Sequence, residues 1–439
     1  MLNSEEKVPT SRLARLATLG SLAAKVAGNM VVDGTKKWSR GESISTKKLL
    51  VQPKNIKHLA DKLAQLRGAA MKVGQLLSMD AGDLLPAELT QLLDKLRANA
   101  QPMPHKQLLT VLKAQWGEHW LDNFAHFDLQ PFACASIGQV HIAYLENGEK
   151  LAVKVQYPGV ANAINSDVDN VAALLKVSGL LPAHFEIDEL IAQAKRQLLA
   201  EADYLNEANL VKSYREMLGD NRFVLPKVID DFSAQSILTM SYIDGIAIDE
   251  ITQLPQAIKD NVVTSLIGLF LDELFTYQFM QTDPNFANYL YQADTDRIVL
   301  LDFGATRVIP KHISLGYLAL IKASINNDKM AMITAAKNIG FFADNIDETY
   351  LAQILAIFTL ACEPLVHDQA YDFANSGLAL RIKEQGMLIN TQQKQWHTPP
   401  IDAVFIHRKL AGLYLLAAKL EAKVNTHQLF SKFIDKEGQ

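Results

Sequence analysis

The stretch Gln281-Thr-Asp-Pro-Asn-Phe-Ala-Asn288, followed downstream by Ile298-Val-Leu-Leu-Asp-Phe-Gly304, decides the fold of this chain. In the first stretch, Asp283 is followed five residues later by an asparagine. The four apolar residues that open the second stretch predict a short buried strand ending at Asp302, paired with residues 289–291 across a polar turn. The asparagine and Asp302 therefore stand 14 residues apart, across one predicted hairpin.

These residues, with a lysine upstream, supply the parts that phosphoryl transfer needs: metal ligands, a cation for the phosphates and a carboxylate near the nucleophile. Asp283 would orient or deprotonate the attacking group, and Asn288 and Asp302 would bind Mg²⁺. Lys154, in Leu-Ala-Val-Lys, would reach the α/β-phosphates of ATP. Taken alone, Asp283 also fits a capped turn and Lys154 a surface strand. Their joint occurrence in this order predicts a kinase-like protein.

Residues 136–156 predict a β-hairpin. Alternating apolar and polar residues run over 136–145, Asn147-Gly148 is a strong turn signal, and 150–156 form the return strand. Alternation places Lys154 on the same face as Ala152. Helices are predicted at 105–116, 161–179, 186–217 and 254–280, over much of 55–100, and in many segments from 312 to 435. The apolar run Thr349–Cys362 is predicted to be a buried helix.

Two parts of an ordinary protein kinase are missing from the sequence. A glycine-rich loop is replaced by alanine-rich residues that carry a Cβ, so this loop is stiffer and its backbone approaches phosphates less freely. No Ala-Pro-Glu follows the Asp-Phe-Gly, which argues against a peptide-binding activation segment. The candidate nucleotide-binding residues, apart from Lys154, are Ala133, Cys134, Ala135 and Ser136 in the loop and Ser241 and Ile243 at a strand end.

Composition agrees with a two-lobed globular protein. The chain has 439 residues, 49% of them hydrophobic, and a net charge of −5, which argues against nucleic-acid binding. Two cysteines in this length exclude a disulfide scaffold and fit a reducing compartment. Residues 1–54 differ from the rest because they contain ten Lys or Arg and only four Asp or Glu, which gives a local net charge of +6.

The N-terminal region carries the sequence signals for location and for membrane attachment. No signal peptide and no transmembrane helix are predicted, so the expected location is cytoplasmic, with peripheral attachment to the inner membrane. Residues 11–38 place leucines at steps of three or four with basic residues beside them, which is typical of an amphipathic helix on an anionic membrane surface. An ordinary helix packed on the body of the protein fits the same pattern.

The motifs together resemble the AarF/UbiB family of atypical kinase-like ATPases, associated with coenzyme Q biosynthesis, and most of all the branch with mitochondrial eukaryotic members. The resemblance extends from about Val8 to the C-terminal helices. Its marks are Gly-Ala-Ala-Met-Lys72-Val-Gly-Gln75, Phe132-Ala-Cys-Ala-Ser-Ile-Gly-Gln-Val-His141, Val153-Lys-Val-Gln-Tyr-Pro-Gly159, Glu201-Ala-Asp-Tyr-Leu-Asn-Glu207, Phe279-Met-Gln-Thr-Asp-Pro-Asn285 and Leu300-Leu-Asp-Phe-Gly-Ala-Thr-Arg307. Cys134 departs from the family loop, which usually has alanine there.

The resemblance implies an α+β, bilobal protein-kinase-like fold with a small β-rich N-lobe, a large helical C-lobe and an N-terminal helical extension. That extension carries the Lys72–Gln75 motif and lies over the region where a protein substrate would dock. Glu207 would pair with Lys154, while Glu201 and Asp203 would receive Lys72. On a regular helix, however, Asp203 would lie closer to Glu207 than to Glu201, so the exact pairing stays open. The alternative is that Lys72 is a solvated lysine and that the three acidic residues form one solvated face.

Four segments are expected: 1–54, basic segment and linker; 55–128, helical extension; 129–243, N-lobe; and 244–439, C-lobe. The predicted function is an ATP-binding, Mg²⁺-dependent atypical kinase or ATPase of ubiquinone or related isoprenoid-quinone lipid metabolism. Expected partners are ATP, the quinone lipid or its phenolic precursors, an anionic membrane surface and quinone-biosynthesis proteins. The alternatives are a non-catalytic nucleotide-gated scaffold or lipid-binding chaperone for those proteins, and a small-molecule kinase.

Overall fold

The computed structural model describes residues 68–80, 102–178, 187–219, 222–283, 285–342, 346–392 and 400–434. The chain divides into two compact units, each built from two stretches of sequence. The first unit is Met1–Lys212 with Lys227–Tyr242, and the second is Ser213–Pro226 with Ile243–Gln439. The four segments expected from the sequence stay a prediction, and residues 1–54 lie outside the described part.

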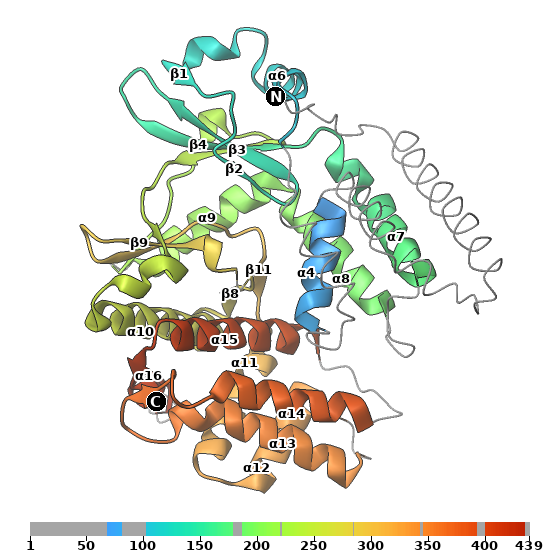
Figure 1. Cartoon of the computed structure of the whole chain (residues 1–439), viewed down its shortest axis with the longest axis vertical. Coiled ribbons are helices and arrows are strands. Elements are labelled where there is room, and N and C mark those ends of the chain that lie inside the picture. Colours follow the sequence, from blue (N-terminus) through green and yellow to red (C-terminus); the bar gives the residue numbers. More distant parts are fainter. Residues whose placement is uncertain are drawn as a thin grey trace, which may run out of the picture. The chain divides into compact units, whose positions relative to one another are not determined.

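An antiparallel sheet forms the centre of the first unit (Figure 1). Its strands are β1 (His126–Phe127), β2 (Ala133–Cys134), β3 (Gly138–Tyr144), β4 (Lys150–Gln156) and β6 (Ile237–Ser241), in the order β1-β3-β4-β6 with β2 on the side of β3. The predicted hairpin over 136–156 is confirmed as β3 and β4. Gly148 takes a φ of 83° in its turn, a conformation that glycine adopts without strain.

Strand β4 shows the period of two that a half-covered sheet requires. Leu151, Val153 and Val155 are fully buried, whereas Ala152 and Lys154 on the opposite face are half-buried. The predicted shared face of Ala152 and Lys154 is therefore confirmed. Helix α6 (His105–Trp116) contacts β4, and the aromatic rings of Trp116, Trp120, Phe124 and Phe127 cluster together.

Within the described residues, four further helices pack in or begin in the first unit: α4 (Gly68–Asp80), α7 (Val160–Ser178), α8 (Ile187–Glu201) and α9 (Tyr204–Leu218). Helix α4 packs against both α7 and α8. The single helix expected over 186–217 is wrong, because the chain breaks between Glu201 and Tyr204. The cause is local: Asp203 accepts the backbone N–H of Asn206 at 3.0 Å, which caps α9 and starts a new helix.

The second unit contains a four-stranded sheet in the order β5-β10-β9-β7. Its central hairpin joins β9 (Tyr289–Gln292) to β10 (Arg297–Leu300), as predicted; β5 (Phe223–Val224) and β7 (Ile246–Ala247) flank it. A second pair joins β8 (Phe279–Gln281) to β11 (Thr306–Val308), and a third β12 (Tyr371–Asp372) to β13 (Lys423–Val424). The helices are α10 (Gln256–Asp272), α11 (Lys311–Ile325), α12 (Lys329–Ile339), α13 (Glu348–Cys362), α14 (Leu378–Gln392), α15 (Ile401–Lys419) and α16 (Thr426–Ile434).

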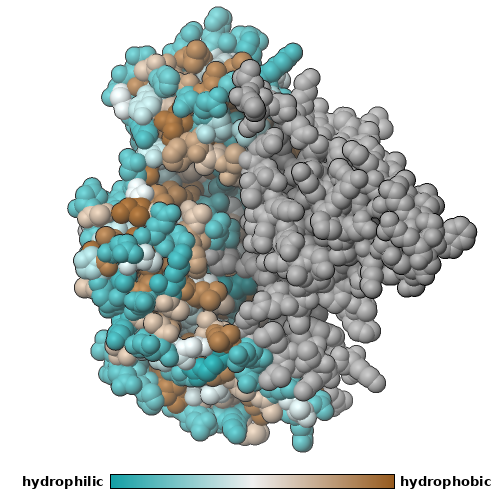
Figure 2. Space-filling view, viewed as in Figure 1, coloured by the Kyte–Doolittle hydropathy of each residue, from teal (hydrophilic) through white to brown (hydrophobic). Residues whose placement is uncertain are grey.

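Helix α13 is less buried than its sequence suggested. Only Ile354, Phe358 and Cys362, spaced four apart, are buried, while Ala352 and Ala356 are exposed. The helix packs along a single stripe, so the expectation of a buried helix is wrong for its other side. On the face shown in Figure 2, hydrophobic residues lie in separate groups among hydrophilic ones. Among the described residues, no helix combines the length and the apolar character needed to cross a bilayer.

Candidate active site

The first unit holds Lys154 in a fixed position. Its ammonium donates to both carboxylate oxygens of Glu207, at 2.9 Å each. The Lys154 side chain is 14% exposed and the Glu207 side chain is 1% exposed. The same ammonium lies 5.0 Å from the ring centre of Tyr204, which opens α9. A carboxylate from the first turn of a helix thus holds a strand lysine at the half-exposed face of the sheet.

The surface around Lys154 suits a flat apolar ligand. Val140 lies opposite Lys154 in the β3–β4 register, and Ile142 lies opposite Ala152. All four residues are half-buried and lie on one face of the sheet. This arrangement sets an apolar strip beside a fixed cation, which is the combination that a purine and its phosphates require.

A second ion pair links three separate segments of the first unit. Lys72 of α4 donates to Glu201 Oε1 at the end of α8, and the Ser136 hydroxyl donates to Glu201 Oε2 at 2.7 Å. The Lys72 side chain is 7% exposed. Helix α4 approaches the loop closely because Gly68 has no Cβ: an added Cβ would lie 2.5 Å from Ile137 Cγ2. The Lys72 helix is thereby joined to the alanine-rich loop.

Two of the other loop residues predicted to touch a nucleotide are exposed, and the third, Ala135, is half-buried. Ala133 and Cys134 form β2, and the Ala135 N–H donates to the Gly138 carbonyl at 2.9 Å.

The remaining predicted residues lie elsewhere. Asp203, expected from the resemblance to receive Lys72, is exposed and caps α9. Ser241 ends β6, where its hydroxyl accepts the Lys227 N–H at 2.9 Å. Ile243 is the first residue of the second stretch of the second unit, and the Gln75 side chain lies outside the described part.

The second unit brings Asn288 and Asp302 to one end of the β9–β10 hairpin. The Leu301 N–H donates to the Asn288 carbonyl at 3.0 Å, and Asp302 Oδ1 accepts the Gly304 N–H at 2.9 Å. Asp283 and Asp302 both lie close enough to the Tyr289 hydroxyl to act on its pKa. Burial is the main cause that raises this pKa, and the charges of Glu273, Asp283 and Asp302 raise it further. The Asp283 carboxylate also accepts the Asn285 N–H at 3.2 Å.

The oxygens of Asn288 and Asp302 suit a hard divalent cation. Mg²⁺ binds proteins through one or two carboxylates, keeps several waters and takes further ligands from phosphates. Within the described ranges, no group of three or more His, Cys, Asp or Glu residues could hold a metal unaided. Asn288 is 9% exposed, and its buried amide nitrogen has no hydrogen-bond partner in the described part of the chain. The residues fit a cation that a nucleotide brings with it.

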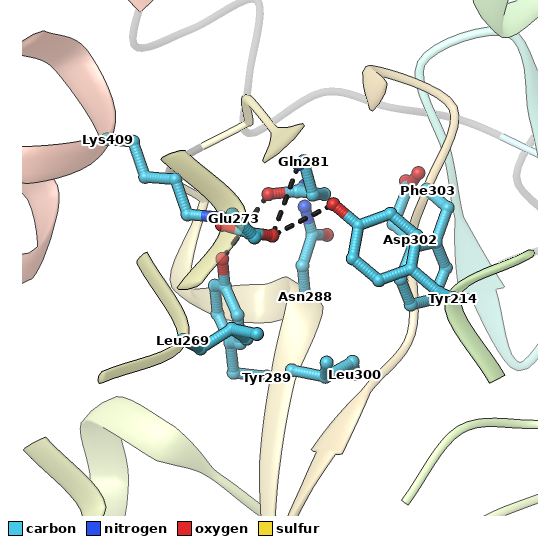
Figure 3. A pocket seen from close by; sticks show the side chains of 10 residues that line it. All are labelled: Tyr214, Leu269, Glu273, Gln281, Asn288, Tyr289, Leu300, Asp302, Phe303 and Lys409. Carbon is cyan, nitrogen blue, oxygen red and sulfur yellow. Dashed lines mark hydrogen bonds and ion pairs between the residues drawn. The ribbon is translucent and has the colours of Figure 1, made fainter. Parts of the chain in front are cut away.

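Close to Asn288 and Asp302 lies a polar cluster that was not predicted from the sequence (Figure 3). Lys409 of α15 donates to Glu273, and the Tyr214 hydroxyl donates to the other oxygen of Glu273 at 2.9 Å. Burial raises the pKa of Glu273 and lowers that of Lys409, although the charge of each partner opposes the shift. The Tyr214 ring also packs against the Phe303 ring, with ring centres 4.6 Å apart and planes tilted by 48°.

The sequence offered one signal for this cluster. Asp272 and Glu273 together interrupt the apolar run Ile267-Gly-Leu-Phe-Leu-Asp-Glu-Leu-Phe275, where a carboxylate needs a partner if its side of the helix is buried. Nothing in the spacing points to Lys409, because it follows 136 residues later and comes from the C-terminal helices. The pairing is a product of the tertiary fold.

The ABC1 atypical kinase-like domain profile matches residues 95–336, more than half of the chain. The chain belongs to this family. Among curated relatives, the ABC1-family chain is 36% identical to "Atypical kinase coq-8, mitochondrial" of Caenorhabditis elegans over 98% of its own length and 58% of that protein. It is 35% identical to "Atypical kinase COQ8, mitochondrial" of Saccharomyces cerevisiae over 97% and 85% of the two chains.

A solved structure supports the fold of this ABC1-family chain. The Rv3197–erythromycin complex of Mycobacterium tuberculosis superposes with a TM-score of 0.59 and 24% identity, covering 87% of this chain and 96% of that one. Taken with the family match, the α+β kinase-like fold expected from the sequence is confirmed. The resemblance to the AarF/UbiB family and its mitochondrial members is confirmed as well.

Proposed function

We propose that this ABC1-family chain is an ATP-binding, Mg²⁺-dependent atypical kinase or ATPase that supports ubiquinone or related isoprenoid-quinone lipid metabolism. The observation that carries the proposal is the paired lysine: Lys154 is held by both oxygens of Glu207, beside an apolar strip of sheet. In protein kinases a strand lysine must be paired with a helix glutamate for phosphoryl transfer. The likeness to COQ8 proteins of worm and yeast supports the quinone-lipid assignment.

Each residue has a defined task under this proposal. In the first unit, Lys154 binds the α/β-phosphates and the alanine-rich loop, Ala133–Ser136, lies along them. In the second unit, Asn288 and Asp302 supply oxygen ligands, and Asp283 orients the attacking hydroxyl or water. Bound Mg²⁺ neutralises charge on the phosphates. The chain therefore positions its reactants and adds no covalent step of its own.

The Lys72 helix has a regulatory task in this proposal. Lys72 is buried against Glu201, and Glu201 in turn holds Ser136 in the loop. We expect this helix, with Gln75, to hinder the docking of a protein substrate and to favour a small acceptor or water. The expectation follows from the loop contact and from the missing Ala-Pro-Glu.

The deciding experiment measures phosphate release by the pure full chain with Mg-ATP, with and without anionic liposomes and phenolic quinone precursors. Asp302→Asn should abolish Mg²⁺-dependent ATP binding and phosphate release, because a full charge is lost beside the cation. Asp328→Asn, at the N-cap of α12, is the control and should leave both intact. ATP binding without phosphate release would favour the nucleotide-gated scaffold, and equal thermal shifts with Mg-ATP for the Asp302 variant and its parent would contradict the metal assignment.

Location and membrane attachment belong to the proposal too. The worm and yeast relatives are named mitochondrial, so a cytoplasmic place for this chain stays a prediction. Residues 1–54 carry a net charge of +6, which favours anionic lipid by about 1 kcal/mol for each basic residue at the surface. Deleting residues 1–40 should reduce co-sedimentation with anionic liposomes. Unchanged sedimentation, with no effect of salt on the intact chain, would assign this segment to packing.

A further inference from the structure

The ion pair between Lys409 and Glu273 is the feature of the second unit that the proposed function leaves unused. The two side chains are 4% and 1% exposed. This pair is more enclosed than the Lys72–Glu201 and Lys154–Glu207 pairs. A buried ion pair seldom stabilises a fold more than well-packed apolar residues of similar volume would. Stability alone is therefore a weak account of why these two charges lie here.

The contacts of Glu273 lead directly to the loop that carries the candidate metal ligands. Glu273 Oε1 accepts the Tyr214 hydroxyl at 2.9 Å and the Gln281 backbone N–H at 3.3 Å. Gln281 is the last residue of β8 and stands two residues before Asp283. The Tyr289 hydroxyl donates to Gln281 Oε1 at 3.4 Å, which ties the same residue to β9. One carboxylate thus fixes the start of the catalytic loop.

The backbone between Glu273 and Gln281 is irregular. Residues Glu273–Tyr277 form a turn of π-helix, and Gln278 takes a left-handed conformation with φ of 51°. π-Helical turns are rare and occur frequently at functional sites. Left-handed non-glycine residues persist only where their surroundings enforce them. Glu273 provides that enforcement, because its carboxylate bonds the backbone at the far end of the irregular segment.

A small cavity joins this cluster to the candidate metal ligands (Figure 3). The cavity has room for about one water molecule. Glu273, Gln281, Asn288, Asp302 and Lys409 all line it. The buried amide nitrogens of Gln281 and Asn288 have no partner among the described residues. A water molecule in this cavity would accept hydrogen bonds from both amide nitrogens.

We propose that the Lys409–Glu273 pair is a positioning device that presets the oxygens of Asn288 and Asp302 for a divalent cation. The Lys409 ammonium compensates the buried Glu273 carboxylate, and the acceptor oxygen of Glu273 anchors the loop through the Gln281 N–H. The identity of the cation as nucleotide-bound Mg²⁺ rests on the proposed function. The anchoring of the loop does not, and it is measurable in the chain without ligand.

Two double variants separate positioning from simple stability. Glu273→Gln with Lys409→Met removes both charges, yet the amide oxygen still accepts from Tyr214 and Gln281. Glu273→Leu with Lys409→Met removes the charges and the acceptor together. Neither double leaves an uncompensated buried charge, so both should fold. The control is Lys432→Met, which breaks the surface pair with Asp272, the residue before Glu273.

Two readouts test the device. The Mg²⁺ concentration at half-maximal ATP binding should rise by about tenfold or more in the Leu/Met double, as for other residues that orient metal ligands. It should stay close to the parent value in the Gln/Met double and in Lys432→Met. Amide hydrogen exchange over residues 279–288, in the chain without nucleotide, should likewise accelerate in the Leu/Met double alone.

The outcomes that overturn the inference are distinct from those that overturn the proposed function. Equal exchange over residues 279–288 in the two doubles would show that the pair is only a packing element. If exchange differs but the parent binds no Mg-ATP, the proposed function fails and the anchoring stands. If the parent binds Mg-ATP and both doubles keep its Mg²⁺ midpoint, the positioning inference fails and the function stands.

Discussion

Lys154 and Glu207 form a two-pronged contact, in which one ammonium donates to both oxygens of one carboxylate at 2.9 Å each. The carboxylate is almost fully buried and the ammonium is not. This asymmetry matters because the buried carboxylate depends on the pair for its charge to be tolerated, whereas the lysine side chain stays partly exposed.

Lys154→Met should therefore damage both stability and ligand binding. The Glu207 carboxylate would lose both hydrogen bonds from the ammonium in a nearly dry place, at a cost of about 3–5 kcal/mol. The double variant Lys154→Met with Glu207→Met should recover most of the unfolding free energy but none of the ATP affinity. Urea unfolding and ATP titration of both proteins make the comparison. ATP affinity equal to that of the parent in the double variant would remove Lys154 from the nucleotide site.

Lys72→Ala should lower the free energy of unfolding by about 3 kcal/mol, because Glu201 loses its cation where little water reaches and keeps only the hydrogen bond from Ser136. Lys72→Arg should not restore the parent value, since a planar guanidinium does not replace a compact ammonium there. Lys113, whose side chain is 46% exposed and pairs with Glu118, is the matched control. Lys113→Ala should change stability by less than about 1 kcal/mol. Similar melting temperatures for the two alanine variants would make Lys72 an ordinary surface lysine.

Gly68→Ala tests the close approach of α4 to the loop. The new methyl group would lie 2.8 Å from the Ser136 carbonyl oxygen, so the helix or the loop must shift, at about 1–3 kcal/mol. Gly386→Ala in α14 is the control, because no described residue other than its own neighbours and helix backbone comes within 4 Å of the added Cβ. That change should be neutral or stabilising by up to about 1 kcal/mol. Chemical denaturation gives the unfolding free energy of each variant. Equal changes in the two would mean that α4 can shift away from the loop at no cost.

Stability should fall in mild acid because of His407. Burial lowers its pKa from 6.5 to about 4. Its ring stacks on Phe341 and bonds the Tyr317 hydroxyl at 2.8 Å. As pH falls through this window, the unfolded chain binds a proton that the folded chain does not, so up to about 3 kcal/mol is lost. Unfolding curves at pH 7 and pH 4.5 should show a smaller loss for His407→Gln than for the parent. An identical loss in both would exclude His407 as the cause.

Local signals explain what the sequence predicted well. The Asn147-Gly148 turn and the alternation beside it are enough to define β3 and β4, because both strands and their turn lie within 20 residues. The hairpin of β9 and β10 follows from the same kind of evidence. In both cases the residue of interest, Lys154 or Asp302, stands inside or directly after the strand that positions it.

Non-local packing explains what the sequence did not predict. The break before α9 depends on whether Asp203 caps a helix or continues one, and apolar periodicity is alike in both cases. Lys409 and Glu273 are far apart in sequence, so no pattern of spacing joins them. The exposed side of α13 was missed because its residues are as apolar as its buried stripe.

The placement of the two cysteines equips the native chain for a fluorescence assay. Cys134 is exposed in the alanine-rich loop, whereas Cys362 is buried and its thiol has a pKa raised to about 11 by that burial. Since the thiolate is the species that reacts, a maleimide dye at neutral pH should attach at the loop alone. Emission from that dye would then report each nucleotide that reaches the loop, in a chain with no engineered substitution.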